Sequence, residues 1–138
     1  MAYAGDVTAR QAWEQLSKDR RAVLVDVRTP AEWSYVGMPD LSALGKTLVK
    51  VFWQAYPGLA LNGQFAEELG RAGLSKDDSL YFLCRSGARS RAAAEAMTAL
   101  GYQRCYNVAD GFEGPHDGER HRGQLAGWKA SGLPWTQE

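Results

Sequence analysis

The chain has 138 residues, the size of one compact domain, and its 45% hydrophobic and 23% charged residues are typical of a globular protein. Sixteen basic residues balance sixteen acidic ones, so no net field points to nucleic acid or an anionic membrane as a partner. The first ten residues lack the apolar core of a signal peptide, and two cysteines are too few for a disulfide scaffold, so we expect a cytoplasmic protein.

A helix, a buried strand and a second helix are predicted in the first part of the chain. Residues 8–11 have the spacing of a capping box, which predicts a helix after the threonine. The valine-rich run 22–27 predicts a buried strand. Residues 29–32 then offer a threonine N-cap, a proline at the first helical position and a glutamate, so we expect a helix directly after this strand, ending at Gly37.

Strands and helices continue to alternate in the second part. Residues 48–53 are rich in valine and aromatic side chains and predict a strand, and 62–73 predict a helix capped by its first residue, an asparagine. The apolar run 79–84 predicts a second buried strand, 89–100 a helix with an apolar stripe, and 105–108 a further strand. This alternation predicts an α/β fold with a parallel sheet and helices on both faces.

Cys84 stands at the end of the second buried strand, where ligands bind in parallel sheets. Gly87 permits a tight turn in which successive backbone N–H groups point at one atom, and the following helix adds unpaired N–H groups. Arg85 and Arg89 add positive charge, which favours the nucleophilic thiolate and would bind an oxyanion. A cysteine ending an apolar run is more often an inert core residue, but this cationic, glycine-containing loop indicates a functional one.

Four motifs in the chain resemble signatures of the rhodanese family of sulfurtransferases. They are CRSGARS (84–90), LVDVRTPAEW (24–33), GMPD (37–40), and NVADGFEG (107–114) followed by GWKASGLPW (127–135). Met38 replaces the histidine that the family has in the third motif. The resemblance spans residues 8–135 and implies a single rhodanese-like domain over 1–138, with a central parallel sheet of about five strands.

The resemblance also implies a reaction. Thiolate Cys84 would attack the outer sulfur of thiosulfate or a similar donor, release sulfite and keep a persulfide, which a thiol or cyanide acceptor then takes. The loop amides would stabilise the persulfide anion, and the two loop arginines would hold the donor's oxygens. The substrate-binding residues would be Arg85, Ser86, Gly87, Ala88 and Arg89. A protein could be the sulfur acceptor, and no cofactor is expected.

Two charged residues near the first buried strand, Asp26 and Arg28, support this loop in our interpretation. Asp26 ends the strand and is expected to pair with a loop arginine, Arg85, or to accept loop N–H bonds. Arg28 and Glu32 are four residues apart at a helix start, which favours a local ion pair over a catalytic role.

Two other classes of protein remain open. Some phosphatases and arsenate reductases use a similar loop, but with five residues between cysteine and arginine; here four residues separate Cys84 from Arg89, and Ser90 occupies the position of the phosphatase arginine. The shorter loop favours a sulfur atom over a whole oxyanion. The domain could also be a sulfur carrier, or a non-catalytic module that binds a protein partner, although such modules commonly lack the cysteine.

The remaining candidates have plainer interpretations. Cys105 falls in a predicted strand and is expected to be a core thiol. His116 and His121 lie in a polar insert, 114–127, whose spacing matches no common metal site, so we expect a solvated loop and no metal. No apolar run is long enough to cross a bilayer, and neither a membrane nor a nucleic acid is an expected partner.

Overall fold

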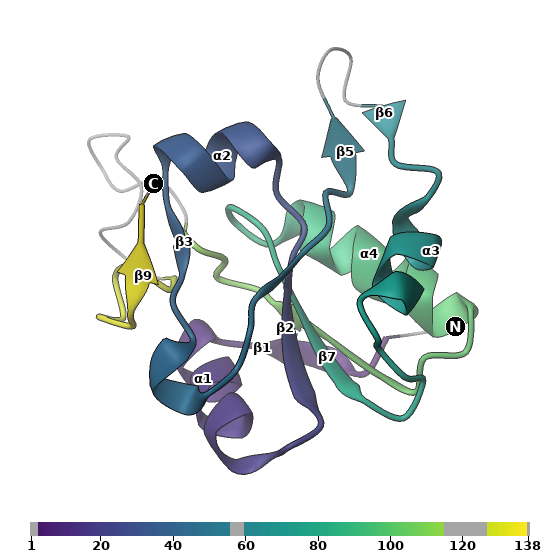
Figure 1. The fold of residues 1–138 in the computed structure, drawn as a ribbon, viewed down its shortest axis with the longest axis horizontal. Helices are drawn as coiled ribbons and strands as arrows, with labels where there is room; N and C mark the ends of the chain where they lie inside the picture. Colours follow the sequence, from purple (N-terminus) through teal and green to yellow (C-terminus); the bar gives the residue numbers. More distant parts are fainter. Residues whose placement is uncertain (1–2, 56–59, 115–126, 138) are drawn as a thin grey trace.

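A five-stranded parallel sheet runs through the middle of the molecule, in the order β1-β8-β7-β2-β4 (Figure 1). The structure is a computed structural model and describes residues 3–55, 60–114 and 127–137. The strands are β1 (Gly5–Val7), β2 (Ala22–Asp26), β4 (Val49–Lys50), β7 (Ser79–Leu83) and β8 (Arg104–Val108). The α/β class and the parallel sheet are confirmed, whereas β1 was not predicted.

Helices cover both faces of this sheet, as predicted. They are α1 (Ala9–Lys18), α2 (Pro30–Tyr35), α3 (Phe65–Arg71) and α4 (Ala88–Ala99), with a short 3-10 turn at Ser42–Leu44. The fully buried strand β7 separates two hydrophobic clusters, because successive side chains of a strand point to opposite faces. Leu80 and Phe82 pack with α3 and α4 on one face, and Tyr81 and Leu83 pack with α1 on the other.

Helix starts follow the predicted capping chemistry in two cases and depart from it in one. Thr8 and Thr29 each form the complete capping box, so α1 and α2 begin where the sequence predicts. The predicted cap of α3 is wrong, because Asn62 lies outside the helix and Gln64 holds the cap position without a side-chain bond. The Asn62 amide nitrogen donates to the Phe52 carbonyl and to Glu68, and its side-chain oxygen accepts from the Gln64 N–H, ahead of the helix start.

Two short antiparallel ribbons complete the architecture. β3 (Met38–Pro39) pairs with β9 (Trp135–Thr136), and β5 (Gln54–Ala55) pairs with β6 (Ala60–Leu61). The Lys129 ammonium donates to the Val36 carbonyl at 2.9 Å and so ties the C-terminal segment to the end of α2. Among the described residues, no helix is both long enough and apolar enough to cross a membrane.

Candidate active site

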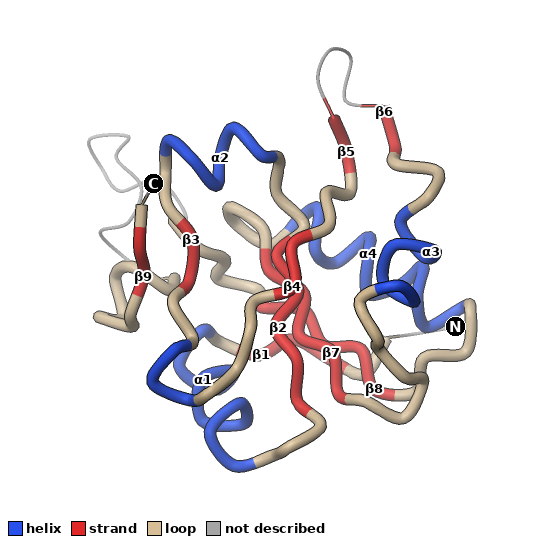
Figure 2. The backbone as a smooth tube through the Cα atoms, in the orientation of Figure 1, coloured by secondary structure: helices blue, strands red, loops and turns tan. Residues whose placement is uncertain are grey.

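The carboxyl ends of the three central strands meet at one edge of the sheet. Asp26 is in register with Leu83, and Phe82 with Asn107, so the segments after β2, β7 and β8 leave the sheet at the same level. Figure 2 shows the loops after β2 and β7 emerging together at this end. Cys84 directly follows β7 and therefore lies at the centre of this edge.

The thiol of Cys84 contacts the first turn of α4 and the loop that precedes it. The backbone N–H of Gly87 donates to Sγ at 3.1 Å, and Ser90 Oγ lies 3.2 Å from the same sulfur. Cys84 is 1% exposed, and its carbonyl accepts a 2.8 Å hydrogen bond from the backbone N–H of Phe112. The sulfur thus sits where a helix start presents N–H groups, an arrangement that stabilises negative charge.

Two glycines allow the Cys84 loop, residues 84–89, to close against the turn at 109–114. Gly87 has φ +108°, and a Cβ atom there would lie 2.4 Å from the Ala109 carbonyl oxygen. Gly111 has φ +68°, and a Cβ atom there would lie 2.3 Å from the Arg85 carbonyl oxygen. Any side chain at either position would force the two segments apart, so the shape of the loop depends on the turn as well as on its own sequence.

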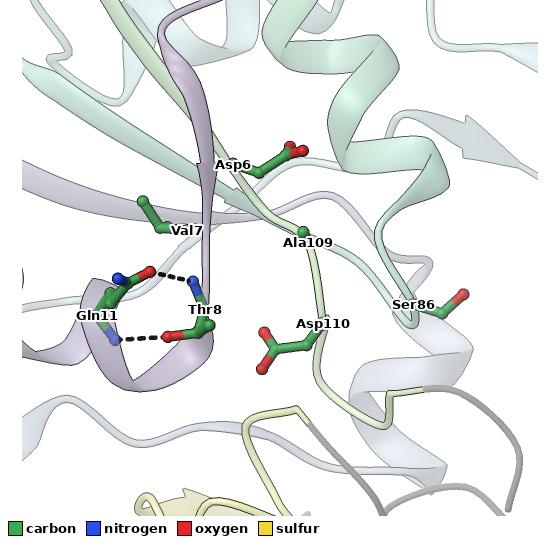
Figure 3. Close-up of a pocket in the computed structure, with 7 residues that line it drawn as sticks. All are labelled: Asp6, Val7, Thr8, Gln11, Ser86, Ala109 and Asp110. Atoms are coloured by element: carbon green, nitrogen blue, oxygen red, sulfur yellow. Dashed lines mark hydrogen bonds between the residues drawn. The ribbon is translucent and has the colours of Figure 1, made fainter.

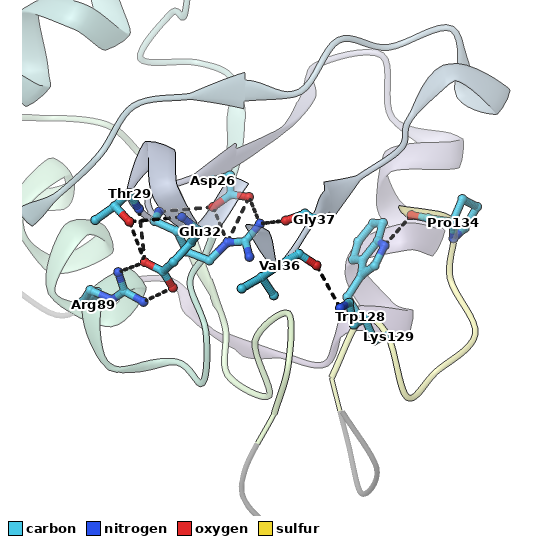
Figure 4. A network of polar contacts seen from close by, with 10 residues as sticks. Asp26, Thr29, Glu32, Val36, Gly37, Arg89, Trp128, Lys129 and Pro134 are labelled. Atoms are coloured by element: carbon cyan, nitrogen blue, oxygen red, sulfur yellow. Dashed lines mark hydrogen bonds and ion pairs between the residues drawn. The ribbon is translucent and has the colours of Figure 1, made fainter. Parts of the chain in front are cut away.

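Arg89 forms a two-bonded ion pair with Glu32 of α2. The distances are 2.7 Å from Nη1 to Oε1 and 2.9 Å from Nη2 to Oε2 (Figure 4). Burial raises the pKa of Glu32, but the hydrogen bonds and charge of Arg89 outweigh it and hold that pKa below its ordinary value. The predicted local pair between Arg28 and Glu32 is wrong, because the glutamate reaches across to α4.

Asp26 pairs with Arg28, so the predicted pairing of Asp26 with Arg85 is also wrong. Both side chains are fully buried; Arg28 Nη2 donates to Asp26 Oδ2 at 2.7 Å, and Nε donates to Oδ1 at 2.9 Å. Nη2 also donates to the Gly37 carbonyl at 2.7 Å, which links the end of β2 to the segment after α2 (Figure 4). The guanidinium lies over the Phe112 ring, 4.3 Å from its centroid. The buried pair thus holds the end of β2 in place beside the end of β7, which Cys84 follows.

Arg85, Ser86 and Ala88 are exposed at the outer surface of the loop. The Arg85 side chain has no hydrogen-bond or ion-pair partner within the described residues, which leaves it as the available cation beside Cys84. Ser86 lines a shallow hollow at the ends of β1 and β8 (Figure 3). The other residues that line it are Asp6, Val7, Thr8, Gln11, Ala109 and Asp110. Burial raises the pKa of Asp110, whose carboxylate accepts from the Ala9 N–H at 2.8 Å.

Three polar residues that are linked to the thiol by a chain of hydrogen bonds were not predicted from the sequence. Ser90 touches Sγ, Asn107 accepts from the Ser90 hydroxyl at 2.6 Å, and Asp6 accepts from the Asn107 amide at 3.1 Å. A signal for Ser90 was available, because it lies in the first turn of the helix that follows Cys84. Asp6 and Ser90 come from elements distant in sequence, and only the pairing of β1 with β8 brings them together.

Cys105 lies in β8 within the core, as expected for a structural thiol. Burial raises its pKa, which keeps the thiol protonated and unreactive at neutral pH. Among the described residues, no group of three potential ligands lies close enough to hold a metal ion. His116, His121 and most of the 114–127 insert lie outside the described residues, so the absence of a metal stays a prediction.

Comparisons with known proteins find similar chains along the whole length. The sequence matches the family model described as "STR4 middle domain" over residues 4–138. The crystal structure of Rv0390 from M. tuberculosis has a TM-score of 0.89 and 53% sequence identity, covering 99% of this chain and 100% of that chain. A Rickettsia rickettsii protein called "Uncharacterized protein RP600 homolog" is 39% identical, covering 94% of this chain and 95% of its own.

More distant matches carry functional names. A protein of Allochromatium vinosum named "Sulfurtransferase" is 26% identical, covering 94% of this chain and 92% of its own. The crystal structure of a rhodanese-related protein from Thermoplasma volcanium covers 100% of both chains with a TM-score of 0.56. Its sequence identity is 18%, so this likeness shows the fold alone, and that fold is rhodanese-like.

Proposed function

Since this chain belongs to the STR4 middle-domain family and has a rhodanese-like fold, we propose that it is a sulfurtransferase whose nucleophile is Cys84. The observation that carries the proposal is the hydrogen bond from the Gly87 N–H to Sγ at the start of α4. A sulfur held by backbone N–H groups at a helix start is suited to carry negative charge, either as a thiolate or as the outer sulfur of a persulfide.

The reaction proceeds in two displacements at sulfur. The Cys84 thiolate attacks the outer sulfur of thiosulfate; a new S–S bond forms, the old S–S bond breaks, and its electron pair leaves with sulfite. Cyanide or a thiolate then attacks the outer sulfur of the persulfide. The Cys84–sulfur bond breaks, the electron pair returns to Cys84 as thiolate, and the acceptor leaves as thiocyanate or as a new persulfide. No external oxidant or reductant is needed.

The two loop arginines differ in how they could serve the donor. One N–H group on each Nη atom of Arg89 bonds to Glu32, so the guanidinium is held toward α2 while its charge acts on Cys84. Arg85 is exposed and has no partner among the described residues. We therefore assign contact with the oxygens of a thiosulfate-like donor to Arg85, and shaping of the loop to Arg89.

Mass spectrometry of the intact protein tests the proposal. Incubation with thiosulfate should add the mass of one sulfur atom, and cyanide should remove it with the release of thiocyanate. Cys84→Ser should abolish both changes, and the matched Cys105→Ser variant should keep both. Equal loss in both variants would refute the assignment of the nucleophile.

Two outcomes would point to the other classes of protein. A persulfide that forms on Cys84 but is not transferred to cyanide would favour a sulfur carrier that serves a protein partner. Hydrolysis of aryl phosphates that is lost in Cys84→Ser would favour a phosphatase. Negligible phosphatase activity is expected, because Ser90 stands where the phosphatase loop has its arginine, and Arg89 is paired with Glu32.

A further inference from the structure

A chain of hydrogen bonds leads from the Cys84 thiol to the molecular surface. Ser90 Oγ lies 3.2 Å from Sγ and donates to Asn107 Oδ1 at 2.6 Å. Asn107 Nδ2 in turn donates to Asp6 Oδ1 at 3.1 Å, and the Tyr3 hydroxyl donates to the same oxygen at 2.6 Å. Ser90 and Asn107 are buried, whereas Asp6 is exposed. The chain therefore connects a surface carboxylate to the proposed nucleophile.

The carboxylate fixes the direction of every bond in this chain. An ionised carboxylate only accepts hydrogen bonds, so Asn107 must present its amide nitrogen to Asp6 and its oxygen to Ser90. A hydroxyl has one hydrogen, which Ser90 donates to that oxygen. Toward Sγ, Ser90 therefore offers only lone pairs.

This direction suits a thiol and opposes a thiolate. A Cys84 S–H can donate to Ser90 Oγ, but a thiolate faces the oxygen's lone pairs. Ser90 could turn its hydrogen toward the thiolate only by leaving Asn107 Oδ1 without a donor. Asn107 is 3% exposed, and a buried polar atom without a partner costs free energy. The Gly87 N–H acts in the opposite sense, because it donates to Sγ.

We propose that Asp6 is a positioning residue for sulfur transfer, which acts through Asn107 to fix the Ser90 hydroxyl as an acceptor and so restrains ionisation of the Cys84 thiol. The inference rests on the proposed role of Cys84. In the persulfide, Sγ carries neither the proton nor the charge, which moves to the outer sulfur. The restraint therefore acts on the free thiol and not on the loaded form.

Several other charged groups lie around this chain of hydrogen bonds, and the substitutions of Asp6 replace none of them. They are Arg85 and Arg89 on the Cys84 loop, Glu32 on α2, Asp26 and Arg28 at and after the end of β2, and Arg91, which lies over the Tyr3 ring. Asp6 is the middle residue of β1 and lies on the rim of the shallow hollow, with its carboxylate directed toward α4 (Figure 3). Its exposure makes it a position where substitution leaves the core intact.

The rate of alkylation of Cys84 by iodoacetamide, followed on the full chain by peptide mass spectrometry, tests the proposal. In Asp6→Ala the Asn107 amide is free to turn over and donate to Ser90, which then donates to Sγ. We expect alkylation at pH 7 to be about fivefold to tenfold faster than in the wild type, since hydrogen bonds to charged groups are the stronger class. The gain should disappear at high pH, where the thiol is ionised in both proteins.

Asp6→Glu is the matched control. Its carboxylate still only accepts hydrogen bonds, so Asn107 must keep its amide nitrogen toward residue 6 and the direction of the chain is kept. We expect a rate within about twofold of the wild type. In a Ser90→Ala background, Asp6→Ala should have no further effect, because the link to Sγ is gone.

Each other outcome overturns the proposal. Acceleration by Asp6→Ala that persists in the Ser90→Ala background would show an effect of charge and not of direction. An unchanged rate in Asp6→Ala, or a gain that is the same at every pH, would mean that the chain does not restrain ionisation. Alkylation needs no sulfur donor, so this result is independent of whether thiosulfate loads Cys84, and the proposed function can fail separately.

Discussion

Two arginine–carboxylate pairs flank the candidate site, and they differ in depth. The Asp26–Arg28 pair is 0% exposed on both side chains and also holds the Gly37 carbonyl. In the Glu32–Arg89 pair, the side chains are 19% and 21% exposed. The first pair joins backbone segments beneath the sheet edge, and the second joins α2 to the Cys84 loop. The deeper pair thus maintains the fold, and the outer pair is placed to adjust the site.

The largest expected effect is that of removing the deep arginine. Arg28→Ala leaves the Asp26 carboxylate buried without its partner, which should lower the free energy of unfolding by about 3–5 kcal/mol. Urea unfolding measures this loss. The double variant Asp26→Leu/Arg28→Met should lose less than Arg28→Ala alone, because no unpaired charge stays buried. An Arg28→Ala protein as stable as the wild type would break the distinction between the two pairs.

Removing the outer pair should have a smaller effect. Glu32→Ala and Arg89→Ala should each cost about 1–2 kcal/mol of unfolding free energy, between the values typical of exposed and buried pairs. The double variant should cost less than the sum of the single ones, since the two residues bond to each other. Losses as large as that of Arg28→Ala would show that partial exposure makes no difference here.

The pH dependence sharpens the same comparison. Because Arg89 lowers the pKa of Glu32 below its ordinary 4.5, the pair stabilises the fold above that pH, and the contribution disappears as pH falls through the folded-state pKa. The difference in unfolding free energy between wild type and Glu32→Gln should be about 1 kcal/mol at pH 7 and should shrink below pH ~4.5. A difference that grows on acidification would contradict the assigned sign.

The smallest effect on stability is expected for the third arginine, which lacks a partner among the described residues. Arg85→Ala should change the free energy of unfolding by less than about 0.5 kcal/mol. It should nevertheless raise KM for thiosulfate and leave kcat nearly unchanged, because it removes a binding contact. Arg91→Ala is the matched control, since Arg91 is exposed on α4, the helix that follows this loop, and pairs with Glu95. An unaltered KM in Arg85→Ala would show that another group holds the donor.

The strand, turn and helix around Cys84 could be predicted from the sequence, because each depends on residues that are neighbours in the chain. An apolar run, Cys84, a glycine and an apolar helical stripe follow one another directly, and the structure confirms strand, turn and helix in that order. The Thr8 and Thr29 capping boxes are equally local.

The partners of the charged residues could not be predicted, because they depend on contacts between distant segments. Glu32 and Arg89 are 57 positions apart, so the i, i+4 spacing of Glu32 with Arg28 led to the wrong pair. Strand β1 was missed for a similar reason. It has three residues, including the polar Asp6, and its register is set only by pairing with β8.

That pairing has a consequence for biosynthesis. β1 is the first strand to be synthesised, yet it lies at the sheet edge against β8, which emerges roughly a hundred residues later. During translation, Gly5–Val7 must wait for Arg104–Val108 before it can join the sheet. The hydrogen bond between Asp6 and Asn107 therefore forms only after the segment that contains Cys84 has been synthesised. A nascent chain stalled before β8 would carry the proposed nucleophile without the restraint that we propose.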